Sequence, residues 1–292
     1  MKKFMRNCAI LAGIMIVLGL GMTLTAAVVK GPSMVAGWRD SVPWDDLEDS
    51  VLSGLEGLDS GIRYELRDNI VFDSKYSILK GSSEQSFSAD DVESLEIEMG
   101  VCEVIIEESE DEEFHVEVGN AGKYQGYVSG STLYLRGMSK TGIGKKDKGC
   151  TIYLYVPKGH EFDKVELSMG AGEIGAETNL KVRNLEIELG AGDITLESVT
   201  VNTLDAEIGM GALELSGDIG KKAEVECAMG SVELELVGDE TDYNYQLAAA
   251  AGEINIGNRS FGGMAGETYI DNNAAKEIDI ECAMGSIDIS FK

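Results

Sequence analysis

The sequence predicts an all-β protein whose C-terminal part is a β-solenoid, a stack of strand-corner-strand repeats of about 20 residues. A ten-residue phrase recurs along the chain, for example at 165–174 and 185–194. The last glycine of each copy falls at Gly172, Gly192, Gly211, Gly230, Gly252 and Gly285, with steps of 20, 19, 19, 22 and 33 residues. A recurring period of this kind is typical of stacked repeats.

Within each phrase, apolar and acidic residues alternate, as in the segment 185–189. Alternation with a period of two is typical of a half-buried strand. A short corner follows, and it ends in glycine, which tolerates positive φ and close backbone approach. Alternation then resumes, so each repeat is strand, corner, strand. One repeat cannot bury its apolar face alone, whereas stacked repeats form a continuous core.

The chief alternative is a β-sandwich of hairpins with Gly-x-Gly loops. It explains the glycines but not the period of about 20 residues, so we favour the solenoid for residues 93–292. Residues 113–157 fit the period less well. We predict strands there at 114–118, 132–135 and 151–156, with a loop at 139–149, as irregular early rungs.

Residues 1–30 predict a cytoplasmic tip and a transmembrane anchor. The segment 8–29 has no charged residue, and a helix of this length spans about 33 Å, enough for a bilayer core of about 30 Å. Lys2, Lys3 and Arg6 precede it, which predicts a cytoplasmic N-terminus and an extracellular C-terminal domain in a single-pass membrane protein. A signal peptide cleaved near Ala27 is the alternative; it delivers the same domain outside.

Residues 31–92 are predicted to form a connector that contains a short amphipathic helix. Pro43 is placed at the first helical turn, and an apolar stripe at helical spacing follows: Trp44, Leu47, Val51, Leu55, Leu58 and Ile62. The stripe is expected to pack against the rest of the protein or against a partner helix. Residues 63–92 are interpreted as an irregular link with a short strand at 70–72.

The charge balance restricts the partners. With 52 acidic and 24 basic residues, the formal net charge is −28. Such a surface repels nucleic acid and anionic lipid, so we expect no nucleic-acid partner. It favours cations, cationic peptides, basic proteins or wall polymers as partners; simple solubility is the alternative explanation.

Stacking would align the acidic residues of successive phrases in columns. Like charges about 4.8 Å apart repel each other by about 1 kcal/mol in water, which predicts raised carboxylate pKa values or bound cations. The candidate cation-binding residues are Glu186, Glu188, Asp205, Glu207, Glu224 and Glu226. Ca²⁺ is the cation that suits carboxylate ligands, although no EF-hand motif is present; a solvated acidic face is the alternative, and no other cofactor is expected.

Four cysteines, Cys102, Cys150, Cys227 and Cys282, fall in the predicted external part, where disulfides persist. Cys227 and Cys282 occupy the phrase position of Leu189, which is predicted to point inward. They lie two phrases apart, or roughly two strand spacings. We therefore interpret them as small buried hydrophobic residues, with a disulfide as the alternative.

No catalytic constellation stands out. His115 and His160 appear isolated, and no distinct carboxylate pair separates from the periodic acids. The basic segment 142–146 lacks the spacing of a phosphate-binding loop. We therefore expect a protein that is not an enzyme.

The repeated phrases at Gly170–Ile174 and Gly190–Ile194, together with the single N-terminal span, resemble the bacterial putative-adhesin family. That family includes membrane-anchored members of Lia-type envelope-stress systems. The resemblance covers about residues 93–292 and implies an adhesin-like interaction module with no site residues to transfer. The alternative it implies is an envelope-stress component that captures cationic antimicrobial peptides or regulates a membrane partner.

Overall fold

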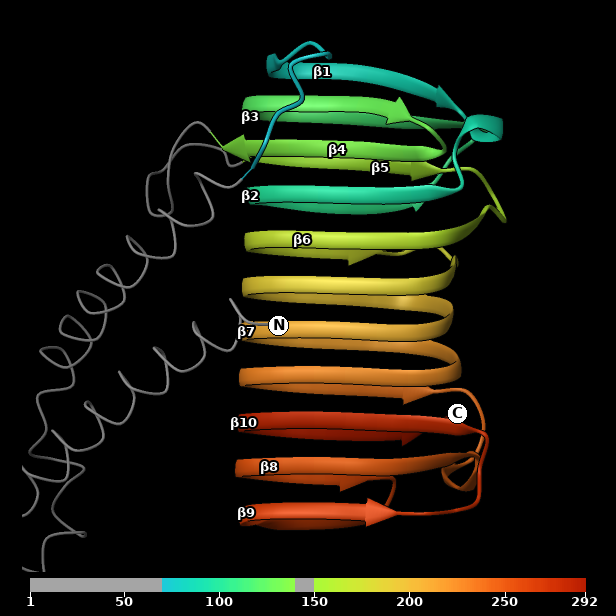
Figure 1. Ribbon diagram of the computed structural model, residues 1–292, viewed down its shortest axis with the longest axis vertical. Coiled ribbons are helices and arrows are strands. Elements are labelled where there is room, and N and C mark those ends of the chain that lie inside the picture. Colours follow the sequence, from blue (N-terminus) through green and yellow to red (C-terminus); the bar gives the residue numbers. More distant parts are fainter. Residues whose placement is uncertain (1–69, 140–149) are drawn as a thin grey trace, which may run out of the picture. The chain divides into compact units, whose positions relative to one another are not determined.

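The computed structural model describes residues 70–139 and 150–292, which form an all-β stack (Figure 1). The predicted transmembrane and amphipathic helices lie outside these residues. Within the described ranges, no helix has the length and apolar character needed to cross a bilayer.

The centre of the stack is parallel and in register. β2 (Ser94–Glu108) pairs with β6 (Glu161–Ala176), and β6 pairs with the start of β7 (Leu180–Leu236). β7 winds through three successive rungs, coloured yellow to orange in Figure 1. Matching phrase positions face each other, such as Glu166 with Glu186 and Ile174 with Ile194. The solenoid prediction is therefore confirmed for this part, and the hairpin sandwich is excluded.

The corner glycines make this stacking sterically feasible. Gly192 and Gly211 have φ values of 128° and 142°, a region that residues with a side chain rarely adopt. A Cβ atom placed on Gly211 would overlap the carbonyl oxygen of Gly192 in the rung beside it. The recurring glycine thus lets one corner lie directly over the next.

The N-terminal end is antiparallel. β3 (Glu113–Ser129) pairs antiparallel with β1 (Leu79–Ser88), β4 (Thr132–Ser139) and β5 (Cys150–Val156). β4 and β5 in turn pair in parallel with the two halves of β2. The three strands predicted between 113 and 157 are present. The prediction of an irregular link was wrong at β1, and residues 70–72 are not a strand.

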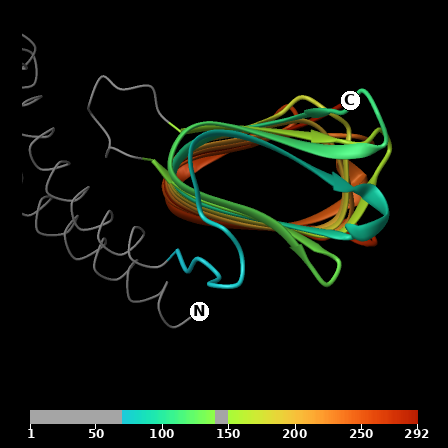
Figure 2. The same ribbon diagram turned by 90° about the horizontal axis from the view of Figure 1, so that it is seen from above.

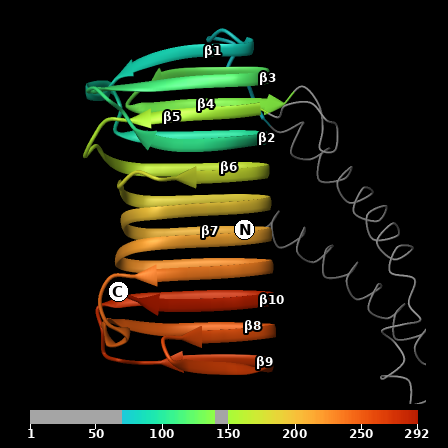
Figure 3. The ribbon, with the colours of Figure 1, turned by 180° about the vertical axis from the view of Figure 1, so that it is seen from behind.

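The C-terminal strand departs from sequence order. β8 (Tyr243–Ile256) and the antiparallel β9 (Arg259–Ile270) precede β10 (Lys276–Phe291) along the chain. β10 nevertheless lies between β7 and β8 and pairs in parallel with both, as Figures 1 and 3 show. Cys227 and Cys282 are therefore direct register partners, so the prediction of two strand spacings between them was wrong.

Each rung has two faces, which we call the first face, before the corner glycine, and the second face, after it. Figure 2, seen from above, shows these faces as the long sides of a flattened coil. Inward side chains form buried columns; one consists of Ile97, Leu167, Ile187, Ala206, Val225, Ile280 and Leu247. Each large apolar side chain buried in this way contributes about 1.5–3 kcal/mol to folding.

Candidate functional site: an acidic sheet face

The outward side chains of the first face align in two acidic columns. Register pairs such as Glu96 with Glu166 and Glu226 with Glu281 follow from the parallel in-register pairing. Because side chains alternate between the two sides of a strand, acids two residues apart give two parallel columns. The first column is Glu96, Glu166, Glu186, Asp205, Glu224 and Asp279, and the second is Glu98, Glu188, Glu207, Glu226 and Glu281. The predicted alignment of acids is present.

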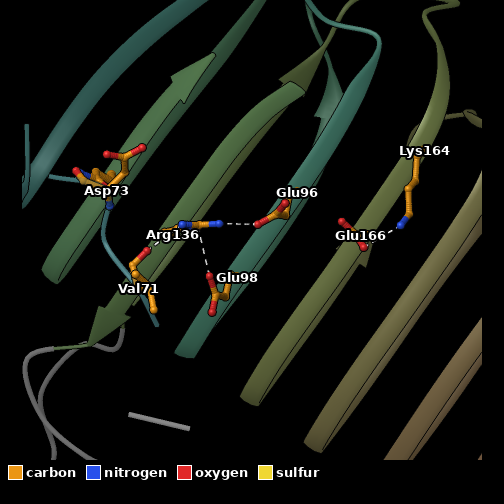
Figure 4. A network of polar contacts seen from close by, with 8 residues as sticks. Val71, Asp73, Glu96, Glu98, Arg136, Lys164 and Glu166 are labelled. Atoms are coloured by element: carbon orange, nitrogen blue, oxygen red, sulfur yellow. Dashed lines mark hydrogen bonds and ion pairs between the residues drawn. The ribbon is translucent and has the colours of Figure 1, made fainter. Parts of the chain in front are cut away.

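Arg136 compensates the charge at the N-terminal end of both columns. It extends from β4, where its Nη2 donates to Glu96 Oε1 at 2.7 Å and its Nε lies 3.1 Å from Glu98 Oε2 (Figure 4). The second contact is an ion pair without hydrogen-bond geometry. Nη1 donates to the carbonyl oxygen of Val71 at 2.7 Å. One half-buried guanidinium thus neutralises two carboxylates and holds the segment around Val71 against the sheet.

Two lysines compensate the first column further along. Lys164 Nζ lies 2.7 Å from Glu166 Oε1, the contact drawn in Figure 4, and 2.9 Å from Glu186 Oε2. Lys222 Nζ lies 2.7 Å from Glu224 Oε2. Each lysine lies two residues before its nearest acid on the same strand, so its side chain points to the same side of the sheet. The first column therefore carries basic partners along its length.

The second column contains an uncompensated tract, which we call the acidic ladder: Glu188, Glu207, Glu226 and Glu281. These four carboxylates occupy successive rungs, three of β7 and then β10. In the described part of the chain, no lysine, arginine or histidine forms an ion pair with any of them. Along the ladder, like charges therefore face each other without a base between them.

The pKa values reflect this arrangement. Partial burial, followed by the charges of Glu226, Glu188 and Asp205, raises the pKa of Glu207. Partial burial, followed by Glu281 and Glu224, raises the pKa of Glu226. The pKa values of Glu98, Asp205 and Asp279 are also raised, with burial again as the largest cause. The predicted upward shift is confirmed for these five groups, although desolvation contributes more than repulsion.

The six predicted cation-binding residues separate into two groups. Glu186 and Glu224 are paired with lysines, whereas Glu188, Glu207 and Glu226 belong to the ladder, and Asp205 lies beside it. Within residues 70–139 and 150–292, no three or more His, Cys, Asp or Glu side chains converge as metal ligands. Ca²⁺ binding therefore stays a prediction.

A second acidic surface lies on the other face. A shallow groove there is lined by Glu214, Glu233 and Asp288, with Glu235 and Lys292 at its side. Lys292 Nζ contacts Glu235 Oε2 at 2.7 Å, whereas no ion pair among the described residues involves Glu214, Glu233 or Asp288. These acids were not predicted as a surface, although the alternation that resumes after each corner glycine is the signal that indicates them.

His115 is not isolated, contrary to the interpretation of the sequence. Its Nδ1 lies 2.8 Å from Ser86 Oγ, and its Nε2 lies 2.8 Å from Asp111 Oδ1. Ser86 and Asp111 are exposed, and the groove described above is elsewhere, on β7 and β10. Catalysis by such a triad also needs oxyanion donors and a place for the substrate. The contacts of His115, which lies in β3, link this strand to Ser86 of β1 and to Asp111 in the bend before β3.

Comparison with known proteins identifies the family. A family model described as Toastrack DUF4097 matches residues 92–291. The chain belongs to this family. The match covers the stack from just before β2 to the end of β10 and confirms the resemblance to putative adhesins; among curated proteins, no match is found.

Several solved structures are similar to this Toastrack chain. A putative cell adhesion protein from Clostridium sporogenes is 15% identical, with 73% of this chain and 100% of that chain covered and a TM-score of 0.43. A putative lipid binding protein from Parabacteroides distasonis is 14% identical, with 73% and 95% covered and a TM-score of 0.32. A putative adhesin from Bacteroides fragilis is 12% identical, with 72% and 98% covered and a TM-score of 0.32. Because these identities and TM-scores are low, the function of these proteins is not transferred, and the function of this chain is argued from its own residues.

Proposed function

We propose that this Toastrack protein is a non-catalytic, adhesin-like interaction module, anchored in the membrane and displayed outside it, whose acidic first face binds cationic partners. The observation that carries the proposal is the acidic ladder of four successive carboxylates with no ion-pair partner among the described residues. A flat parallel sheet holds them at regular spacings of about 4.8 Å.

The chemistry of the ladder favours a polycation over a single ion. Each added positive charge relieves repulsion between two neighbouring carboxylates, so the gain repeats along the column. Binding of cations also favours the ionised form of groups whose pKa is raised, such as Glu207 and Glu226. A basic protein, a positively charged wall polymer or a cationic peptide supplies charges in such a row.

The uncharged segment 8–29 and the basic residues before it support the extracellular location. The resemblance of the repeated phrases to putative adhesins, together with the family match over residues 92–291, supports the adhesin-like part of the proposal. Fractionation tests the anchor. The full-length chain should stay in the membrane pellet after an alkaline wash, and a chain without residues 1–29 should be found in the soluble fraction.

The acidic ladder is tested by exchanging charge on one face at a time. The full-length chain in detergent is titrated with a fluorescent oligolysine peptide at low salt. The double variant Glu207→Gln/Glu226→Gln should lose about tenfold in affinity, the equivalent of two weak charge contacts. The matched control Glu108→Gln/Glu235→Gln has the same net charge, removes two carboxylates of the second face that are paired with lysines, and should bind like the unmodified chain. If both variants lose affinity equally, the binding depends on overall charge and not on the acidic ladder, and the proposed site is refuted.

The alternative is an envelope-stress component that captures cationic antimicrobial peptides. The short length of the ladder favours this function, because four carboxylates match a peptide better than a long polymer. Salt separates the two functions, since screening weakens an exposed electrostatic contact. Peptide binding that disappears at high salt supports capture, whereas attachment to cells that persists at high salt supports adhesion.

A further inference from the structure

The four cysteines in the described part of the chain form two in-register pairs. Cys102 of β2 faces Cys150 of β5, and Cys227 of β7 faces Cys282 of β10. All four side chains are buried, with exposed fractions of 1–4%. The pairs lie near opposite ends of the stack, so they are two independent instances of the same arrangement.

All four cysteines are free thiols in this structure, but the register of each pair suits a disulfide. Neighbouring strands are about 4.8 Å apart, which lies within the Cα separation of about 4.4–6.8 Å found across disulfides. Partners in register on parallel strands also point to the same side of the sheet. Closing the bond requires the two Cβ atoms to approach to about 3.8 Å, a small movement at positions next to the corner or at a strand end.

We propose that Cys102–Cys150 and Cys227–Cys282 are disulfide sites, closed by exchange with the disulfide of an extracytoplasmic thiol oxidoreductase. The presence of that oxidant rests on the extracellular location proposed above; the pairing rests on the register alone. Both bridges would form while the end strands are being added to the stack, before the thiols are covered.

The exchange balances as two thiols and one donor disulfide giving one protein disulfide and a donor dithiol. One cysteine thiolate attacks a donor sulfur and forms a mixed disulfide; the second then attacks the protein sulfur of that bond and releases the reduced donor.

The positions of the pairs give the bridges a structural purpose. Each joins strands that are separated along the chain by other strands: β3 and β4 lie between β2 and β5, and β8 and β9 lie between β7 and β10. The central parallel rungs, which follow one another in sequence, contain no such pair. A cross-link has its largest effect on the unfolded chain where it closes a long loop.

Core packing alone explains the cysteine pairs less well than disulfide formation does. The column of the C-terminal pair decreases in size from Leu189 and Ile208 through Cys227 and Cys282 to Ala249, so two small side chains fit there. Packing does not explain why each cysteine of the described part has another cysteine as its register partner. The second pair, at the other end of the stack, makes the same point independently.

The test is peptide mapping of the full-length chain without reductant. Cells are lysed under denaturing conditions with an alkylating reagent, and digested peptides are weighed by mass spectrometry. The expected result is two linked peptides, 102 with 150 and 227 with 282, each lacking two hydrogens and each separated by reductant. In parallel, the purified chain is unfolded, reduced and refolded in a glutathione redox buffer, which tests the pairing without regard to compartment.

The outcomes separate this inference from the proposed location. Linkage in cells and in buffer supports both, whereas thiols free in cells but correctly linked in buffer support the pairing and refute the extracellular location. Free thiols in both, or exchanged pairs such as 102 with 227, overturn the inference. The variant Cys227→Ala/Cys282→Ala should fold, because Ala249 occupies the same column. It should lose one linked peptide only, and reductant should lower its thermal midpoint less than that of the unmodified chain.

Discussion

Replacing Glu207 by glutamine should stabilise the protein at neutral pH. Glu207 lies in the acidic ladder between Glu188 and Glu226, and their charges contribute to its raised pKa. The amide keeps the size and polarity of the side chain and removes its charge. The variant therefore loses two repulsive contacts and no ion pair.

The expected gain is about 1 kcal/mol at pH 7 and low salt. Two unit charges about 4.8 Å apart repel by about 1 kcal/mol in water. There are two such neighbours, but the side chains are partly exposed and the repulsion is screened, so about half of the sum is retained. For a domain of this size, a gain of this order raises the thermal midpoint by about 2–4 °C.

The gain should depend on pH with a defined sign. A carboxyl whose pKa is raised by folding favours the folded state while it is protonated, and this contribution is lost as the pH rises through the raised pKa. Glu207 and Glu226 are in this class. The difference between the variant and the unmodified chain should therefore shrink as the pH falls from 7 into the range where Glu207 is protonated.

Thermal unfolding at several pH values and salt concentrations measures these differences. Glu186→Gln is the matched control on the same face, because Glu186 is paired with Lys164 at 2.9 Å; it should show no gain. A Glu207→Gln variant that is no more stable than the unmodified chain at pH 7 would refute the reasoning. So would a gain that persists unchanged at low pH and high salt.

Two further substitutions test the frame that holds the acidic face. Gly211→Ala should cost about 3 kcal/mol or more in denaturant unfolding, since its Cβ would overlap the backbone of Gly192; Gly175→Ala, with open space around its Cβ, should change stability little. Arg136→Gln should cost about 2 kcal/mol, because two half-buried carboxylates lose their counter-charge. The same variant should speed amide exchange in the segment held through Val71; unchanged exchange would show that the contact does not hold that segment.

The central rungs could be predicted from sequence because one local rule recurs in them. Alternation places Leu185 and Ile187 inward and Glu186 and Glu188 outward, and the glycine spacing fixes which residues meet in the next rung. The acidic columns follow directly from these two facts. Their bases could not be placed as easily, since Arg136 reaches the columns from β4, which pairs with β2 from outside the regular repeat.

β1 could not be predicted because it lacks the signal that marks the other strands. Its outward and inward positions are both mainly small or polar, and its residues alternate between half-buried and exposed. Its place depends on β3, which offers an antiparallel edge. Hydrophobic periodicity therefore fails where a strand covers the end of a stack instead of contributing to its core.

The place of β10 shows why chemical similarity between repeats leaves their order open. Any two copies of the phrase can pair in register, so sequence order is only the default. Specific contacts to β7 distinguish the observed order: Lys276 Nζ of β10 lies 2.8 Å from Asp218 Oδ1, and Nζ of Lys292, which directly follows β10, lies 2.7 Å from Glu235 Oε2. β8 and β9 are joined by a two-residue turn, so this hairpin can form locally.

This order changes how the C-terminal end is stabilised. In a regular solenoid each repeat contacts its neighbours in sequence, and stability accumulates along the chain. Here the hairpin of β8 and β9 reaches the stack through β10, which follows both of these strands in the chain. The fourth carboxylate of the acidic ladder, Glu281, also belongs to β10. The ladder is therefore complete only when β10 has inserted between β7 and β8, which makes the insertion of β10 a condition for the binding surface proposed above.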